Sequence, residues 1–260
     1  MTRSSGLLCA IHQPNLFPRL STLAKLFTAD IWIALDDVQF ARRDYQHRAR
    51  LGRHDDPNAQ QWMSLPVRSP DGRSSPIKDI GILERERSIR RILRMTRQHH
   101  GRGEHWSAVE AGVRQVAEMI SRTESLADVA ITSTLSLLDL LHWRGIVVRS
   151  SEFVVSADRS TRLADLTHAV GATSYLCGTG GARYLRPDPF SKRAIGVIYF
   201  SVPTDTSHEI WAGAQRLSSI AALAEAGLSA VRHAIEVEVQ LTHHLAPTTE
   251  PTGQQELSLK

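Results

Sequence analysis

Residues 7–48 constrain the fold more than any other stretch, because they have the pattern of a strand, a helix and a second strand. The strands are the apolar runs 7–11 (LLCAI) and 31–35 (IWIAL), and residues 18–29 between them place apolar side chains at helical spacing. A helix-length connection returns the chain to its starting end, so the two strands are expected to be parallel.

The rest of the chain continues this alternation. Strands are predicted at 61–67, 146–148, 173–177 and 195–200, and helices at 83–97, 106–120, 126–143 and 161–170, with the segments 217–223 and 231–239 completing the pattern. Gly145 is expected to end the third helix and Ser160 to cap the fourth. The pattern predicts an α/β fold with a mainly parallel, Rossmann-like sheet, flanking helices and additional helices.

Length and composition fit one soluble domain over residues 1–244. The chain has 260 residues, 42% of them hydrophobic and 22% charged, and its end over 245–260 is polar and proline-bearing, which predicts a disordered tail. No run approaches the ~20 apolar residues of a membrane-spanning helix. With Cys9 and Cys177 as its two cysteines, the chain is expected to be cytoplasmic.

The positive charge of the chain is mild. The formal net charge is +4, which could attract phosphorylated or carboxylated ligands but does not by itself identify nucleic acid. The arginine-rich segment 83–97 is expected to be a solvated helix face rather than a nucleic-acid patch.

Polar residues follow both of the first two strands. The first strand ends in His12-Gln13-Pro14-Asn15, and the second ends in Asp36-Asp37-Val38-Gln39. Open α/β sheets bind ligands outside the carboxyl ends of their strands. The sequence therefore predicts that these side chains meet at one sheet edge and form a site.

His12 with Asn15 is the sharpest candidate pair. A histidine at a strand end can donate a proton or a hydrogen bond, and its ordinary pKa lies near neutrality. The His-x-x-Asn spacing also resembles the His-x-x-His element of class I nucleotidyltransferases, which stabilises phosphate charge. The structural alternative is that His12 binds a backbone carbonyl and Asn15 makes a turn.

Asp36 and Asp37 are adjacent, so in extended structure only one of them can face a given ligand. The other is expected to pair with the segment 42–48. A metal site is an alternative, with His12 and His47 as further ligands. The plainest alternative is a solvated strand end held by surface ion pairs.

A glycine-rich turn, Gly178-Thr179-Gly180-Gly181-Ala182-Arg183-Tyr184, follows a later strand. Its exposed N–H groups and Arg183 could hold an anion. It lacks the P-loop lysine pattern and the full dinucleotide-binding fingerprint. Ser151 follows another strand end and could contribute hydroxyl contacts.

Several blocks of the sequence together resemble the WbqC-like family, in the family's order. They are AIHQPN (10–15), LDDVQF (35–40), QHR (46–48), SSE (150–152), GATSYLCGTGGARYL (171–185) and Phe190. The resemblance implies that the matching positions are functional or shape the site. These positions are His12, Gln13, Asn15, Asp36, Asp37, Gln39, Gln46, Arg48, Ser151, Gly178, Gly181 and Tyr184.

The resemblance also implies a setting and an activity. Members of the family occur among bacterial O-antigen and natural-product genes, and the implied activity is transfer of an amino acid, notably glycine, to a sugar or small molecule. The chain departs from the family after residue 200, because Ala221 stands where an aspartate is expected. If that aspartate contacts substrate, this protein has a different acceptor or has lost activity.

Three hypotheses follow. The first is a transferase for small-molecule substrates, with His12 as general acid or base, Asp36 or Asp37 orienting it or binding an amino group, and Arg48 and Arg183 holding a carboxylate or phosphate. The second is a nucleotide-dependent, carboxylate-activating enzyme that uses ATP and magnesium. The third is a non-catalytic binding protein that acts with biosynthetic partner proteins, and a homo-oligomer is an open alternative in each case.

Overall fold

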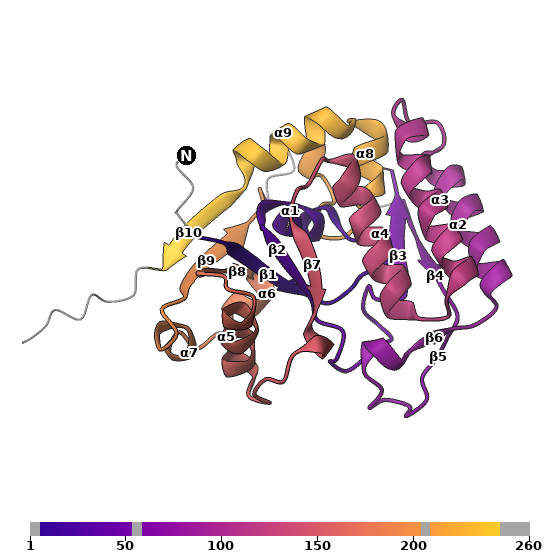
Figure 1. Ribbon diagram of the computed structural model, residues 1–260. Helices are drawn as coiled ribbons and strands as arrows, with labels where there is room; N and C mark the ends of the chain where they lie inside the picture. Colours follow the sequence, from indigo (N-terminus) through magenta and orange to yellow (C-terminus); the bar gives the residue numbers. More distant parts are fainter. Residues whose placement is uncertain (1–5, 54–58, 204–208, 245–260) are drawn as a thin grey trace, which may run out of the picture.

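Within the residues that the computed structural model describes, 6–53, 59–203 and 209–244, a six-stranded sheet runs through the molecule (Figure 1). Its strands, in spatial order, are β10 (Gln240–His244), β9 (Gly196–Ser201), β8 (Ser174–Gly178), β1 (Leu8–His12), β2 (Ile31–Ala34) and β7 (Ile146–Arg149). Neighbours from β9 to β7 are parallel, and β10 lies antiparallel to β9. The predicted α/β fold with a mainly parallel sheet is confirmed.

The central strands are buried on both faces, which is why they are continuous apolar runs. Alternate side chains point to opposite faces, so Ala10 and Trp32 belong to one apolar core while Cys9 and Ile31 belong to the other. The first core packs against α1 (Leu20–Thr28), α4 (Leu126–Leu140) and α9 (Leu228–Glu238), and the second against α5 (Arg159–Ala169) and α7 (Asp188–Ser191), as Figure 1 shows.

Further elements extend the first core. α4 packs on α3 (Trp106–Arg122), which packs on α2 (Arg85–His100) and on α8 (Ile220–Glu225). Two small antiparallel sheets lie outside the main one, formed by β3 (Arg48–Gly52) with β4 (Gln60–Ser64) and by β5 (Val67–Arg68) with β6 (Gly81–Ile82). Short helical turns complete the chain: η1 (Ile77–Asp79), η2 (Ser150–Glu152), α6 (Thr179–Ala182) and η3 (Glu209–Trp211).

Three local predictions were wrong. The strand predicted over 61–67 divides into β4 and β5 on either side of Pro66. Gly145 does not end α4, because the chain already turns at His142 (φ 59°), where the Trp143 indole donates to the Ala29 carbonyl at 2.8 Å. α5 is capped by Asp158 rather than by Ser160, whose hydroxyl instead accepts from the Arg186 amide.

The tail predicted over 245–260 lies outside the described residues. No helix in the described part of the chain is long and apolar enough to cross a membrane.

Candidate functional site

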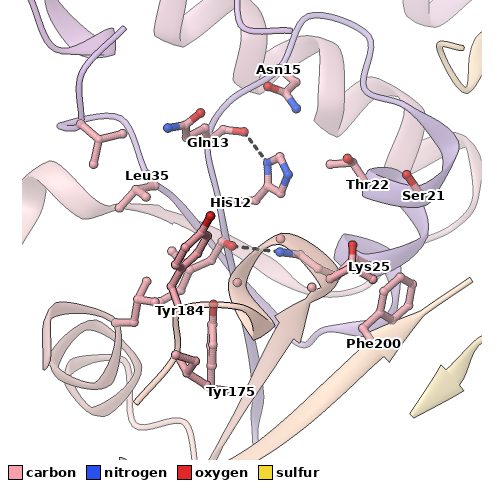
Figure 2. A pocket seen from close by; sticks show the side chains of 18 of the residues that line it. His12, Gln13, Asn15, Ser21, Thr22, Lys25, Leu35, Tyr175, Tyr184 and Phe200 are labelled. Atoms are coloured by element: carbon pink, nitrogen blue, oxygen red, sulfur yellow. Dashed lines mark hydrogen bonds between the residues drawn. The ribbon is translucent and has the colours of Figure 1, made fainter. Parts of the chain in front are cut away.

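A cavity of about 720 Å³ opens at the carboxyl ends of β1, β8 and β9 (Figure 2). This is the edge at which open parallel sheets bind ligands. Ile11, Phe200 and Val202 give it apolar walls, and the loop after β1 gives it polar groups. The predicted site residues that line it are His12, Gln13, Asn15, Gln39, Gly178, Gly181 and Tyr184.

His12 ends β1 with its imidazole in the cavity wall. Its Nδ1 lies 2.8 Å from the Gln13 carbonyl oxygen. A carbonyl can only accept, so Nδ1 carries the proton and the neutral ring keeps its lone pair on Nε2. Burial, reinforced by the positive charge of Lys25, lowers the pKa of His12 to about 3. At neutral pH, Nε2 is therefore an acceptor without a partner among the described residues.

Asn15 is the second polar side chain that this loop presents. It is only 3% exposed, and its Oδ1 has no hydrogen-bond partner within the described part of the chain. The backbone around it is fixed by α4, since Ser133 and Thr134 donate to the Asn15 carbonyl at 3.0 and 3.2 Å. Phe17 follows in the left-handed region (φ 42°), a conformation that a bulky residue adopts only when its surroundings impose it. A buried, rigidly held acceptor without a partner is a group suited to receive a ligand's donor.

Gln46 lies just outside the cavity and orients Gln13. It is fully buried, its Oε1 accepts from the Ala41 amide at 2.9 Å, and its Nε2 donates to the Gln13 Oε1 at 2.8 Å. Both ends of the Gln46 amide are thus satisfied by protein. Gln46 therefore supports the side chain of Gln13, the residue whose backbone carbonyl accepts the hydrogen bond from His12 Nδ1.

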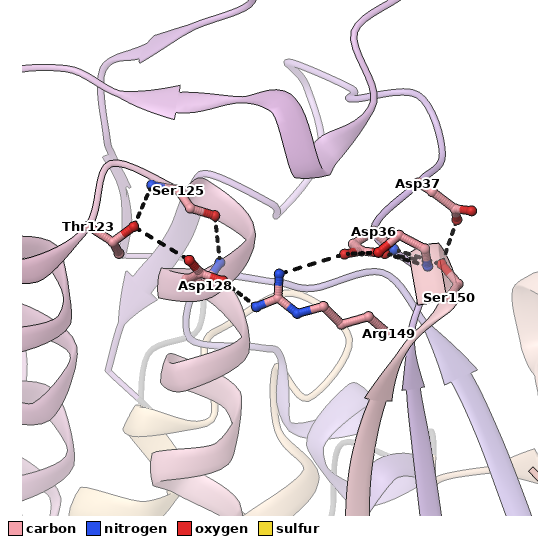
Figure 3. A network of polar contacts seen from close by, with 8 residues as sticks. Asp36, Asp37, Thr123, Ser125, Asp128, Arg149 and Ser150 are labelled. Carbon is pink, nitrogen blue, oxygen red and sulfur yellow. Dashed lines mark hydrogen bonds and ion pairs between the residues drawn. The ribbon is translucent and has the colours of Figure 1, made fainter. Parts of the chain in front are cut away.

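The two aspartates at the end of β2 do not line the cavity. They belong to a separate network of polar contacts (Figure 3). Asp36 is fully buried and accepts from the Ser150 hydroxyl at 3.3 Å and from the Ser151 amide and hydroxyl at 3.1 and 3.0 Å. Arg149 lies 3.9 Å from Asp36 and pairs with Asp128. Asp36 therefore joins the ends of β2 and β7.

Asp37 pairs with Arg162 on α5 and accepts from the Ser150 hydroxyl. Burial alone would raise the pKa of Asp37, but the hydrogen bonds from Ser150 and Arg162 outweigh it and lower the pKa. The sequence expectation that one aspartate pairs with residues 42–48 is wrong, because the partner is Arg162. The expected contact of either aspartate with His12 is likewise absent from the interactions of the described residues.

The remaining predicted residues also lie away from the cavity wall. Arg48 donates to the backbone carbonyls of Asp44 and Arg43 and stacks on Trp62, with its guanidinium carbon 4.0 Å from the ring centre. Ser151 serves Asp36, as above. Arg183 is exposed and is not part of the cavity lining, so the cation expected from the glycine-rich turn is not the one that faces the cavity.

Sequence reasoning missed Lys25, on the sheet side of α1. It is 7% exposed, lines the cavity, and donates from Nζ to the Ile11 carbonyl at 3.0 Å. Burial lowers the pKa of Lys25 to about 8, although the nearby thiols of Cys177 and Cys9 act in the opposite direction. The available signal was its position between Ala24 and Leu26 in a helix that connects two parallel strands and is therefore largely covered.

Other cations that line the cavity were also missed: Arg19, Arg159 and Arg162. Arg162 is paired with Asp37, and Arg159 lies over the Tyr184 ring at 5.2 Å. Asp44 is the carboxylate among the lining side chains of the described residues. The cavity thus has an excess of positive charge, which favours an anionic ligand.

The metal alternative of the sequence analysis finds no ligand set. Among the residues with described positions, no group of three or more His, Cys, Asp or Glu side chains could hold a metal ion. Asp36 directs its oxygens to Ser150 and Ser151, and His47 packs edge-on against Phe40 with ring centres 5.2 Å apart.

Comparisons with known proteins agree with the sequence resemblance. A model of the WbqC-like protein family matches residues 13–232. The chain is also similar to the uncharacterized protein Rv1507c of Mycobacterium tuberculosis (strain ATCC 25618 / H37Rv), with 23% identity over 224 residues that cover 81% of this chain and 90% of that protein.

Proposed function

The chain belongs to the WbqC-like protein family, and we propose that it is a transferase that moves an acyl or aminoacyl group onto an amine or hydroxyl of a small molecule in bacterial polysaccharide or natural-product biosynthesis. The family resemblance suggests the reaction class and its setting. The support from this molecule comes from the polar groups that the cavity presents.

One observation carries the proposal: His12 and Asn15, three residues apart, line one cavity, and His12 Nε2 and the buried Asn15 Oδ1 are acceptors without partners in the described chain (Figure 2). An attacking amine or hydroxyl carries hydrogens to donate. Asn15 would hold the nucleophile through one of them, and His12 would accept the proton that the nucleophile loses. A site built only to hold an anion would present donors instead.

The transfer balances with these two residues. The nucleophile's nitrogen or oxygen forms a bond to the acyl carbon, and the bond from that carbon to the leaving group breaks. The proton passes from the nucleophile to His12 Nε2 and then to the departing group. The Gln13 carbonyl holds the Nδ1 proton throughout, so the ring that gains a proton at Nε2 is stabilised as an imidazolium.

The low pKa of His12 sets a condition on this step. Burial disfavours protonation of the imidazole most, and the positive charges of Lys25 and Arg19 add to this effect. A bound anionic substrate would offset those charges and raise the pKa of His12 toward the range in which a base is effective. Catalysis therefore requires the substrate's own charge.

The test begins with comparison of metabolites between a strain lacking the gene and its parent. The proposal expects an intermediate with an unmodified amine or hydroxyl to accumulate, and the purified protein to convert it. With that substrate, His12→Ala should lower turnover by about 10²- to 10⁴-fold. His168→Ala, which changes an exposed histidine on α5, is the matched control and should leave turnover unchanged.

Two results would contradict the proposal. Full turnover by folded His12→Ala would remove His12 from the reaction. Exchange of pyrophosphate into ATP that depends on magnesium and on a carboxylic acid would instead identify the nucleotide-dependent activation that the His-x-x-Asn spacing suggests.

A further inference from the structure

We propose that Lys25 binds an oxyanion of the substrate, a carboxylate or a phosphate, inside the cavity. This inference rests on the proposed function only in taking the cavity as the substrate site. It replaces Arg48 and Arg183, the cations expected from the sequence, with a residue that does line the cavity.

The first support is the hydrogen-bonding state of the ammonium group. Lys25 is 7% exposed, and among its interactions within the described chain the one hydrogen bond is to the Ile11 carbonyl. An ammonium has three N–H donors, so two remain for a ligand. The charged groups that act on Lys25 within the described chain include the thiols of Cys177 and Cys9 but no carboxylate, and a buried charge without a counter-ion is costly. A ligand oxyanion would supply both the missing acceptors and the missing charge.

The second support is the space beside Lys25. A side chain at Gly178 would place its Cβ 3.3 Å from the Lys25 Cδ and 3.7 Å from Nζ. Gly178 ends β8 with an ordinary extended backbone (φ −77°), so its conformation does not require glycine. The absence of a side chain there instead leaves open the approach to Nζ, and Gly178 itself lines the cavity.

The third support is position relative to His12. In the view of Figure 2, the His12 ring lies between Asn15 and Lys25. The acceptors suit the nucleophile, and the cation that lines the same cavity suits a charged group of the substrate. Lys25 also lowers the pKa of His12, so neutralising Lys25 with an oxyanion relieves that effect.

Binding of an oxyanion should depend on the protonation state of Lys25. The titratable groups that face Lys25 are the Cys9 thiol on β1, the Cys177 thiol on β8 and the His12 imidazole. His12 is neutral at neutral pH, and burial raises the pKa of both thiols, so Lys25 itself is the group expected to titrate near pH 8. An oxyanion favours the ammonium form, and affinity should fall about tenfold for each pH unit above 8.

The experiment measures binding by calorimetry, separately for acetate, inorganic phosphate and pyrophosphate, with the full chain. Lys25→Met keeps the aliphatic stem and removes the charge, and it should weaken binding of the preferred probe about tenfold or more. Lys192→Met, at an exposed lysine, is the matched control and should bind as the unmodified protein does. Arg183→Met tests the competing cation and should have no effect. The probe that binds most tightly decides between carboxylate and phosphate.

Gly178→Ala keeps the proposal testable if Lys25→Met does not fold. The added methyl group should weaken the same probe without changing the charge. Unchanged affinity in folded Lys25→Met, a loss in Arg183→Met equal to that in Lys25→Met, or no binding of any probe by the unmodified protein would overturn the proposal. These readouts involve no turnover, so oxyanion binding can hold while transfer by His12 fails, and the reverse outcome is equally distinguishable.

Discussion

Two strand ends that share one edge of the sheet use their polar residues in opposite ways. At the end of β2, the Asp36 carboxylate accepts from Ser150 and Ser151 and lies outside the cavity wall. At the end of β1, His12 and Asn15 each present an acceptor without a partner among the described residues, and both line the cavity. The difference teaches that charge and position at a sheet edge do not by themselves select a candidate site, and that unsatisfied hydrogen-bonding capacity is the better criterion.

The largest expected effect on stability is at the end of β2, where the polar side chains have their hydrogen-bond partners. Asp36→Ala would leave the Ser151 amide and the Ser151 hydroxyl without their buried acceptor, whereas the Ser150 hydroxyl keeps Asp37, and should lower the free energy of unfolding by about 3–5 kcal/mol. Asp36→Asn keeps the shape and one acceptor, so it should cost less. Urea unfolding measures both. A folded Asp36→Ala protein with unchanged stability but lost turnover would show that Asp36 takes part in the reaction. The contrast between the ends of β2 and β1 would then be wrong.

The next largest effect is the loss of stability at low pH that His12 causes. Above about pH 6.5, His12 is neutral in both the folded and the unfolded chain. Between pH 6.5 and about pH 3, the imidazole is protonated in the unfolded chain but stays neutral in the folded protein. The free energy of unfolding therefore falls as pH drops, by about 2 kcal/mol at pH 5 for each such histidine.

His12→Gln should reduce the loss of stability between pH 7 and pH 5 by about that amount. Urea unfolding at the two pH values measures it. His100, which is 1% exposed and whose pKa burial lowers to about 3, is the comparison, and His100→Gln should have a similar effect. If His12→Gln keeps the full acid sensitivity, the folded protein protonates the imidazole by pH 5, and the expected low pKa of His12 is wrong.

The smallest expected effect on stability is at Asn15, where a substitution should raise the free energy of unfolding rather than lower it. Asn15→Leu keeps the branched shape and removes a buried acceptor without a partner in the described chain, so stability should rise slightly, by at most about 1 kcal/mol. Gln46→Met is the matched change at a buried amide whose two ends are bonded, and it should lower the free energy of unfolding by about 1–3 kcal/mol. Thermal and urea unfolding compare the two variants. A larger loss for Asn15→Leu than for Gln46→Met would mean that the Asn15 side chain is satisfied.

The sequence predicted the sheet better than the site. β1, β2, β8 and β9 are short apolar runs buried on both faces, and burial of that kind leaves a clear pattern. β3 (RARLG) and β10 (QLTHH) were missed, because a polar strand in a small sheet or at a sheet edge has no such pattern. The end of α4 at Leu140 goes with a contact between Trp143 and Ala29, which are distant in the sequence. The cap of α5 is local, because Asp158 accepts from the Thr161 amide at 3.0 Å, and the sequence analysis overlooked it in favour of Ser160.

For the candidate site, the sequence located the edge but not the direction of each side chain. His12 and Asn15 line the cavity as expected, whereas Arg48 and Arg183 do not, because stacking on Trp62 and exposure at the turn draw them elsewhere. Lys25 was missed for the converse reason. Its stem follows the tilt of helix side chains toward the start of α1, which lies at the carboxyl edge of the sheet.

The hydrogen bond from the Gln46 side chain to the Gln13 side chain connects the small β3–β4 sheet to the loop that carries His12. Gln46 stands two residues before β3, and the Gln13 that it holds is the residue whose carbonyl fixes the proton on His12. A change that shifts this peripheral hairpin could therefore alter which imidazole nitrogen is protonated while every strand of the main sheet stays in register. Substitutions in the β3–β4 hairpin could therefore change the tautomer of His12, and with it the chemistry of the cavity, without touching the cavity wall.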